Sequence, residues 1–198
     1  RDPDNPRGFT VGRVEDKIGG DAVHAAELIF EDFRVPKSCL LGQEGQGFYL
    51  AMKTLNKGRL TMAATAVGKA QGALDLAVDY ARQRVVFKQP VAKFQGIQWM
   101  LAEMATKIEA ARRLTYHAAE LLQKDDPGAA HAGAMAKLFA TDMAVEVTSK
   151  ALQIHGGYGY MKEYAVQRYW REARLGQIVE GTNEIQKSII ARTLIGRI

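Results

Sequence analysis

Three long segments carry apolar residues at helical spacing, and this periodicity constrains the fold more than any other feature of the chain. The first spans about residues 49–84, where apolar residues recur every three or four positions: Leu50, Leu55, Leu60, Ala64, Val67, Ala70, Leu74 and Val78. It predicts one long helix or two joined ones. The second segment runs from about 94 to 124 and the third from about 127 to 154, with breaks at Pro90 and Pro127. Long helices joined by short connections predict an antiparallel bundle.

The helix ends also carry recognisable signals. Asp126 followed by Pro127 predicts an N-cap and a first helical residue. A shorter helix is expected over 165–173, and a last one from Asn183 to about 195. Asn183 and Gln186 have the spacing of a capping box, which predicts that Asn183 caps the last helix.

The first 45 residues have a different pattern of residue types. Short runs rich in β-branched and aromatic residues, FTVGRV and HAAELIFEDFRV, are broken by Gly19, Gly20 and Pro36. The period changes to that of a helix after LGQEGQGF. The sequence therefore predicts a mainly α chain, with a small β region in residues 1–45 and a four-helix bundle in residues 46–198.

Composition excludes several classes of protein. With 47% hydrophobic and 25% charged residues, the 198-residue chain resembles soluble globular proteins, and no run of apolar residues is long enough for membrane insertion. The single cysteine, Cys39, cannot form an internal disulfide, and no cluster of Cys and His predicts a metal site. The net charge is +5, but basic residues alternate with acidic ones, which argues against nucleic acid as a partner. Because the chain begins with Arg, we expect a processed product or a fragment.

The most informative segment for chemistry is IVEGTNEIQ, which contains Glu180. This carboxylate precedes the last predicted helix, in a turn that Gly181 makes permissive. Its neighbours Ile178 and Val179 favour partial desolvation, which makes an ionised carboxylate a stronger base. The alternative interpretation is an acidic residue favoured at a helix N-terminus by the macrodipole.

Two further segments are compatible with phosphate binding. In QIHGGYGY, Gly156 and Gly157 would let backbone N–H groups approach a phosphate closely, although a helix C-cap and turn is the alternative. This string follows a helix, so it is not the Rossmann fingerprint. In the string 82–87, RQRVVF, an arginine and an aromatic ring could bind a pyrophosphate and stack on a ring system, or simply form a solvated helix end.

Seven segments, taken in order, resemble the acyl-CoA dehydrogenase family over essentially the whole chain: FEDFRVP, LLGQEGQGF, LNKGR, FQ-x-IQ-x-MLAEMA, QIHGGYGYMKEY, YWREAR and VEGTNEIQ. The family fold has an N-terminal helical domain, a middle β domain and a C-terminal four-helix bundle. The resemblance implies that residues 1–45 end the β domain and that residues 46–198 form the bundle. It also implies FAD-dependent α,β-dehydrogenation of an acyl-CoA, with electrons passed to an electron-transferring flavoprotein.

The resemblance assigns the substrate residues as follows. Glu180 matches the base of the family's EGT motif, which removes the α proton while the β hydrogen leaves as a hydride to flavin N5. Some relatives place the base on the first bundle helix, but the corresponding position here is Gly58. Four residues match substrate contacts, with Asn56 standing where the family has Asp: Asn56, Arg59, Gly181 and Arg192.

The resemblance also assigns an FAD site. Arg84 and Phe87 match the family's R-x-T-F-G string, while Val86 and Lys88 depart from it. The residues that match contacts to the adenosine and pyrophosphate of a neighbouring subunit's FAD are Gln95, Gln153, Gly156 and Gly157. Thr182 and Glu184 match FAD contacts that follow the base. A shared FAD site implies a homodimer or homotetramer.

Two alternatives remain open on the sequence. The first is an acyl-CoA oxidase, which passes the electrons to O₂. The second is a non-catalytic helical relative that binds FAD or DNA, against which the distributed charge argues. A dehydrogenase of this kind is expected in the cytoplasm of a bacterium or the mitochondrial matrix of a eukaryote.

Overall fold

The structure is a computed structural model that describes residues 8–196. The described residues form two compact units, one ending at Met52 and the other beginning at Lys53. The assignment of residues 1–45 to a β domain and of residues 46–198 to a bundle domain stays a prediction.

The first unit is built on a β-hairpin. Strand β1 (Phe9–Val14) pairs antiparallel with β2 (Ala26–Phe30), with an irregularity in the register after Val11. A short 3₁₀ helix, η1 (Lys37–Cys39), follows. Cys39 is exposed, and Leu28 and Phe30 are each more than half exposed. The apolar residues that predicted the strands thus remain accessible on this unit.

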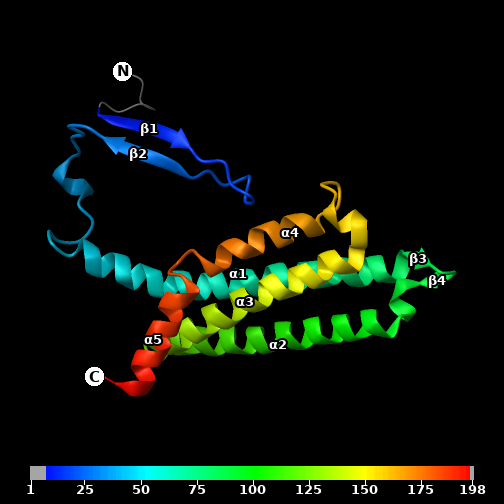
Figure 1. Cartoon of the computed structure of the whole chain (residues 1–198). Coiled ribbons are helices and arrows are strands. Elements are labelled where there is room, and N and C mark those ends of the chain that lie inside the picture. The colour runs from blue at the N-terminus through cyan, green and yellow to red at the C-terminus, as the bar shows by residue number, and fades with distance from the viewer. Residues whose placement is uncertain (1–7, 197–198) are drawn as a thin grey trace. The chain divides into compact units, whose positions relative to one another are not determined.

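The second unit contains the predicted helices, except for the first residues of α1, which belong to the first unit (Figure 1). Helix α1 (Gly47–Gln83) is continuous, so the first segment is one helix rather than two. The remaining helices are α2 (Gln95–Gln123), α3 (Ala129–His155), α4 (Val166–Ala173) and α5 (Asn183–Ile195). The 3₁₀ helices η2 (Val91–Lys93), η3 (Gly156–Tyr160) and η4 (Arg174–Gln177) and the hairpin β3 (Val85–Val86) and β4 (Gln89–Pro90) connect them.

Helices α1 to α4 alternate in direction along the bundle, and α5 packs on α3 at one end (Figure 1). The mainly α fold with an antiparallel four-helix bundle is therefore confirmed. The short α4, rather than the terminal α5, is the fourth antiparallel helix. The buried side chains of the core are mostly alanine, as at Ala70, Ala77, Ala140 and Ala144. Small side chains allow the long helices to approach each other closely.

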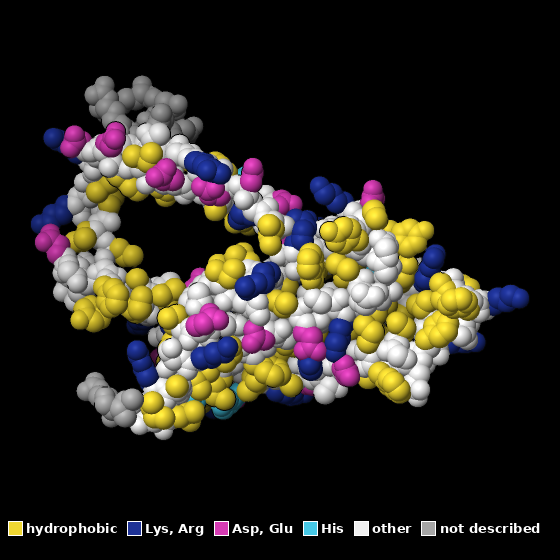
Figure 2. Space-filling view, in the orientation of Figure 1, with side chains coloured by type: hydrophobic (Ala, Val, Ile, Leu, Met, Phe, Trp, Pro, Cys, Tyr) yellow, Lys and Arg dark blue, Asp and Glu magenta, His cyan; other side chains and the backbone are white. Residues whose placement is uncertain are grey.

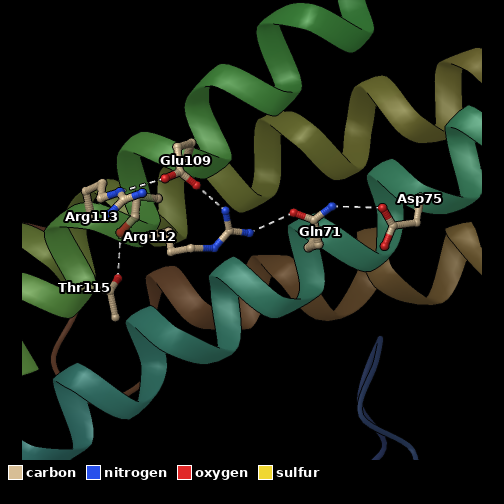
Figure 3. Close-up of polar contacts among 7 residues, drawn as sticks. Gln71, Asp75, Glu109, Arg112, Arg113 and Thr115 are labelled. Carbon is tan, nitrogen blue, oxygen red and sulfur yellow. Dashed lines mark hydrogen bonds and ion pairs between the residues drawn. The ribbon is translucent and has the colours of Figure 1, made fainter.

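A chain of polar contacts on the bundle surface joins α1 to α2 (Figure 3). Arg112 of α2 donates to Gln71 of α1 at 2.8 Å and to Glu109 on its own helix. Gln71 in turn donates to Asp75 at 2.9 Å. Hydrogen bonds from Arg112 and then Arg113 hold the pKa of Glu109 below its usual range. These hydrogen bonds give α1 and α2 directional contacts, which the packing of alanine side chains in the core does not provide.

Both predicted caps are wrong in detail. Helix α3 begins at Ala129, and Asp126 instead accepts a hydrogen bond from the N–H of Gly128 at 2.7 Å in the preceding turn. Helix α5 begins at Asn183, with Thr182 at the N-cap position. The Asn183 side chain is buried against α3, so it is not available to cap its own helix.

Candidate functional site

Glu180 lies in a backbone turn that most residues avoid. Its φ is +55° and that of Gly181 is +84°, so two consecutive residues are left-handed between η4 and α5. Glycine adopts this region freely, whereas a residue with a side chain pays on the order of 1 kcal/mol. Glu180 is partly buried. The turn therefore needs support from the surrounding structure.

Two fully buried side chains supply that support at one oxygen atom. The carbonyl oxygen of Gly181 accepts hydrogen bonds from Lys137 Nζ of α3 at 2.9 Å and from Gln186 Nε2 of α5 at 2.8 Å. Gln186 Nε2 also lies 3.4 Å from the carbonyl oxygen of Glu180. Burial lowers the pKa of the Lys137 ammonium, and the charge of Asp142 acts in the opposite direction.

Lys137 and Gln186 thus form a clamp on the Gly181 carbonyl oxygen. A buried hydrogen-bond network continues from this clamp into α3. Lys137 Nζ also donates to Asn183 Oδ1 at 2.9 Å. Asn183 Nδ2 donates to Asp142 Oδ1 at 2.7 Å and to the hydroxyl of Thr141 at 3.0 Å. Asp142 accepts a further hydrogen bond from Gln177 Nε2 at 2.6 Å. The start of α5 is thus fixed to the middle of α3.

The carboxylate of Glu180 occupies space that α1 leaves open. A Cβ atom added to Gly58 would lie 2.1 Å from Glu180 Oε2, so the carboxylate lies directly over this glycine. Next to it, burial lowers the pKa of the Arg59 guanidinium, while the negative charge of Glu180 raises it. Arg59 Nη1 donates to Asn56 Oδ1 at 2.7 Å. The structure therefore brings Asn56, Arg59, Glu180 and Gly181 together at one end of the bundle.

Thr182 and Glu184 line a neighbouring polar pocket of about 270 Å³ with Asp142, Arg174 and Lys187. The backbone N–H of Glu184 and then the Thr182 side chain hold the pKa of Glu184 below its usual range. This pocket presents both acidic and basic groups to a ligand.

A second group of candidate residues lies at the other end of the bundle (Figure 1). Arg84, Gly156 and Gly157 line an open pocket of about 520 Å³, with Tyr158 beside them. The guanidinium carbon of Arg84 is 5.2 Å from the centre of the Tyr158 ring. Apart from the adjacent residues, no described atom lies within 4 Å of a Cβ built on Gly156 or Gly157, so a ligand can approach the turn closely, while the Gly156 N–H donates to the carbonyl oxygen of Gln153.

One wall of this pocket is aromatic. His155 is buried and stacks on Tyr80 with ring centres 4.3 Å apart. Because its Nδ1 lies 2.8 Å from the carbonyl oxygen of Ala151, this nitrogen carries the proton and donates it. Burial lowers the pKa of His155.

The hairpin β3–β4 projects from the same end of the bundle. Phe87 and Lys88 at its tip have φ values of +48° and +64°, which explains why a glycine suits the position of Lys88. The Phe87 side chain is 89% exposed, and apolar side chains gather over this hairpin in Figure 2. Gln95 begins α2 and Gln153 lies in the last turn of α3, and both are exposed.

The two groups of residues are far apart along α1. Arg59 and Gln83 are 24 residues apart in one helix, which corresponds to about 36 Å. Arg192 lies on α5 and is exposed, nine residues or about 14 Å beyond Asn183. The predicted site residues of one chain therefore do not form a single site.

The described residues give three further observations. Basic and acidic side chains are interspersed over the helices on the face seen in Figure 2. None of the helices in residues 8–196 combines the length and hydropathy needed to cross a membrane. Within the same residues, no three His, Cys, Asp or Glu side chains gather as a metal ion requires.

The buried clamp was not predicted from the sequence, although a signal for it exists. Lys137 belongs to one helical stripe with Ala140, Ala144, Val147 and Ala151, all of which are buried. A lysine on an otherwise apolar stripe indicates a buried ammonium with a specific acceptor.

Residues 45–195 match the family described as Acyl-CoA dehydrogenase, C-terminal domain. The chain is 52% identical to an acyl-CoA dehydrogenase of Bacillus subtilis (strain 168) over 97% of its own length and 50% of that protein. It is 50% identical to the acryloyl-CoA reductase (NADH) of Anaerotignum propionicum, over 96% of this chain and 48% of that protein.

A solved structure is also similar. A chain from the structure described as the electron transferring flavoprotein of Acidaminococcus fermentans is 51% identical, with a TM-score of 0.93. The match covers 98% of this chain and 50% of that one. The chain thus spans about half the length of the relatives that it matches.

Proposed function

Since the chain belongs to the acyl-CoA dehydrogenase family, we propose that it is the C-terminal part of an FAD-dependent enzyme that oxidises an acyl-CoA to the trans-2-enoyl-CoA. The observation that carries this proposal is the carboxylate of Glu180, held over Gly58 in a strained turn beside Arg59. A fixed carboxylate in a partly buried site is the arrangement that proton abstraction requires.

In this proposal Glu180 removes the proton from the carbon next to the thioester. Its left-handed turn, fixed through Gly181, keeps the carboxylate on the bundle end rather than free in solvent. FAD, when bound, supplies the acceptor for the hydride that leaves the β carbon. Developing negative charge on the thioester oxygen requires fixed donors. The positive charge of Arg59 near the carboxylate supports the binding of an anionic intermediate and of the CoA portion.

The glycine turn and Arg84 fit the phosphate groups of FAD. Gly156 and Gly157 expose backbone in an open pocket, and Arg84 adds a cation at its edge. The Gly156 N–H donates to the carbonyl oxygen of Gln153, so the turn offers a phosphate close approach to the backbone at Gly157 together with the positive charge of Arg84. Phe87, Gln95 and Gln153 lie at the same end and are accessible to a ligand or a second subunit.

The distance between the two groups supports a shared site. About 36 Å of α1 separates Arg59 from the end of the helix near Arg84, too far for one dinucleotide to touch both the glycine turn and Glu180 of the same chain. We therefore infer that Arg84 and the glycine turn hold the FAD of a neighbouring subunit, in a homodimer or homotetramer. Asn56, Gly181 and Arg192 remain candidates for contacts to the acyl-CoA, and Thr182 and Glu184 for contacts to FAD.

The test of this function is the visible spectrum of the full-length protein. Bound flavin should be seen directly, and acyl-CoAs of graded chain length should bleach it under anaerobic conditions. A colourless protein that cannot be loaded with FAD, or a flavin that no acyl-CoA reduces, would contradict the proposal.

The direction of the reaction and the electron partner need separate measurements. The similarity to an acryloyl-CoA reductase means that enoyl-CoA should also be tested for reoxidation of the reduced flavin. The similarity to a chain in an electron transferring flavoprotein structure supports such a flavoprotein as the partner. Anaerobic turnover with that partner identifies a dehydrogenase, whereas rapid peroxide release in air without it identifies an oxidase.

A substitution at Arg84 tests the shared FAD site. Arg84→Ala should weaken FAD binding about tenfold and shift the oligomer toward smaller species, because the same contact serves both cofactor and assembly. FAD titration and sedimentation of the full-length protein measure the two effects. Arg113→Ala, which removes an exposed arginine from α2, is the control. A flavin-saturated monomer at low concentration would show that the site is not shared.

A further inference from the structure

We propose that Lys137 is a positioning residue for Glu180, acting through the carbonyl oxygen of Gly181 and the side chain of Asn183. Lys137 is 0% exposed, and its ammonium group lies 2.9 Å from each of these two oxygens. The activity test of this proposal rests on the proposed function. The hydrogen-exchange test rests on the structure alone.

The burial of Lys137 is costly, and packing does not require it. Removing an ammonium group from water costs several kcal/mol unless it is hydrogen-bonded and paired. A methionine would fill nearly the same volume of the α3 interior without that cost. What the lysine adds is a pair of hydrogen bonds directed at the first residues of α5 and the turn before it. Both acceptors, Gly181 and Asn183, lie within three residues of Glu180.

The turn at Glu180 and Gly181 depends on Lys137 because its own residues do little to stabilise it. Glu180 and Gly181 are both left-handed, and Thr182 at the N-cap position makes no side-chain cap. Lys137 and Gln186 approach the Gly181 oxygen from two different helices, so they fix the peptide plane between Gly181 and Thr182, one residue beyond Glu180. Loss of either donor leaves a partly satisfied carbonyl and a turn free to move toward an ordinary conformation.

Movement of the turn matters because the carboxylate has little room. Glu180 Oε2 lies over Gly58, in the space that a side chain at this position would take. A displacement of about 1 Å in a catalytic group can cost up to a hundredfold in rate. Lys137 forms its hydrogen bonds with the backbone and with Asn183 rather than with the carboxylate, and the charge of Glu180 is the smallest of the influences on the pKa of Lys137, so its removal should act chiefly through geometry.

The experiment compares Lys137→Met with Lys150→Met in the full-length flavin-loaded protein. Both replace a lysine on α3, but Lys150 pairs with Glu103 at 2.6 Å and Glu146 at 2.9 Å on the bundle surface. We expect Lys137→Met to lower the rate of flavin reduction by saturating acyl-CoA about thirtyfold, with KM within about threefold and unchanged flavin content. Lys150→Met should keep the parent rate.

The second measurement is amide hydrogen exchange in residues 178–184. Exchange there should be faster in Lys137→Met than in the parent or in Lys150→Met, because the turn loses one of its two clamps. This readout needs no substrate. If the parent is not reduced by any acyl-CoA, the proposed function fails, and the exchange data still decide the role of Lys137.

Gln186→Met provides an independent variant that removes the other donor to the same oxygen. It should lower the reduction rate and loosen residues 178–184 in the same way, and the double variant should lose less than the sum of the two single effects. If Lys137→Met does not fold, Gln186→Met alone decides the question. Parent-like rate and exchange in the variants that fold would overturn the proposal.

Discussion

Replacing Glu180 by glutamine should lower the rate of flavin reduction by acyl-CoA about a thousandfold or more, without loss of folding or flavin binding. The amide is nearly isosteric with the carboxylate but cannot accept the α proton, and general base catalysis typically contributes a factor of a hundred to ten thousand. The backbone carbonyls that fix the turn, at Glu180 and Gly181, are retained in the variant.

Stopped-flow reduction at saturating acyl-CoA measures this effect directly. Thermal unfolding and flavin content should match the parent, because the amide keeps the size of the carboxylate and the proposed FAD contacts of Thr182 and Glu184 are unchanged. Glu120→Gln, an exposed carboxylate on α2, is the matched control. Reduction of Glu180→Gln at the parent rate would remove Glu180 from the mechanism.

The periodicity of the sequence predicted the helices well because each long helix buries a continuous apolar stripe. The prediction of α1 over 49–84 differs from the observed bounds by one or two residues at each end. The bundle partner of α3 was harder to predict. Helix α4 has only eight residues, and its alignment with the long helices depends on tertiary packing rather than on its own pattern.

The candidate site was predictable where it depends on residue identity and not where it depends on burial. Motifs predicted Glu180 and Arg59 as site residues, and the structure places them side by side, but the capping role given to Asn183 was wrong because tertiary contacts with Asp142 and Thr141 outcompete the local cap. A capping box is a local rule that assumes an exposed helix end. The start of α5 is packed against α3, and there the side chains serve the turn before the helix instead.

The position of Gly58 leads to the second prediction. The sequence alone shows only that this position has no carboxylate. The structure adds that the absence of any side chain is required, because a Cβ would lie 2.1 Å from Glu180 Oε2, well inside van der Waals contact. The atom that it would meet is the far end of a flexible side chain, so the carboxylate should rotate away while the backbone stays in place.

Gly58→Ala should therefore separate activity from stability. We expect the rate of flavin reduction to fall about a hundredfold, since the base is displaced by more than 1 Å. Stability should be unchanged or slightly higher, because alanine is favoured over glycine within a helix by roughly 0.5–1 kcal/mol. Stopped-flow reduction and thermal unfolding of the full-length protein give the two quantities.

Gly68→Ala is the matched control on the same helix. Apart from the adjacent residues and the backbone of its own helix, no described atom lies within 4 Å of a Cβ built at Gly68, so this substitution gains the same helical preference and meets no packed side chain. It should retain the parent rate and show the same small gain in stability. If Gly58→Ala reduced its flavin as fast as Gly68→Ala does, the carboxylate of Glu180 would not need the space over Gly58. The catalytic carboxylate would then act from another position, since a steric displacement of this size cannot leave a proton transfer unaffected.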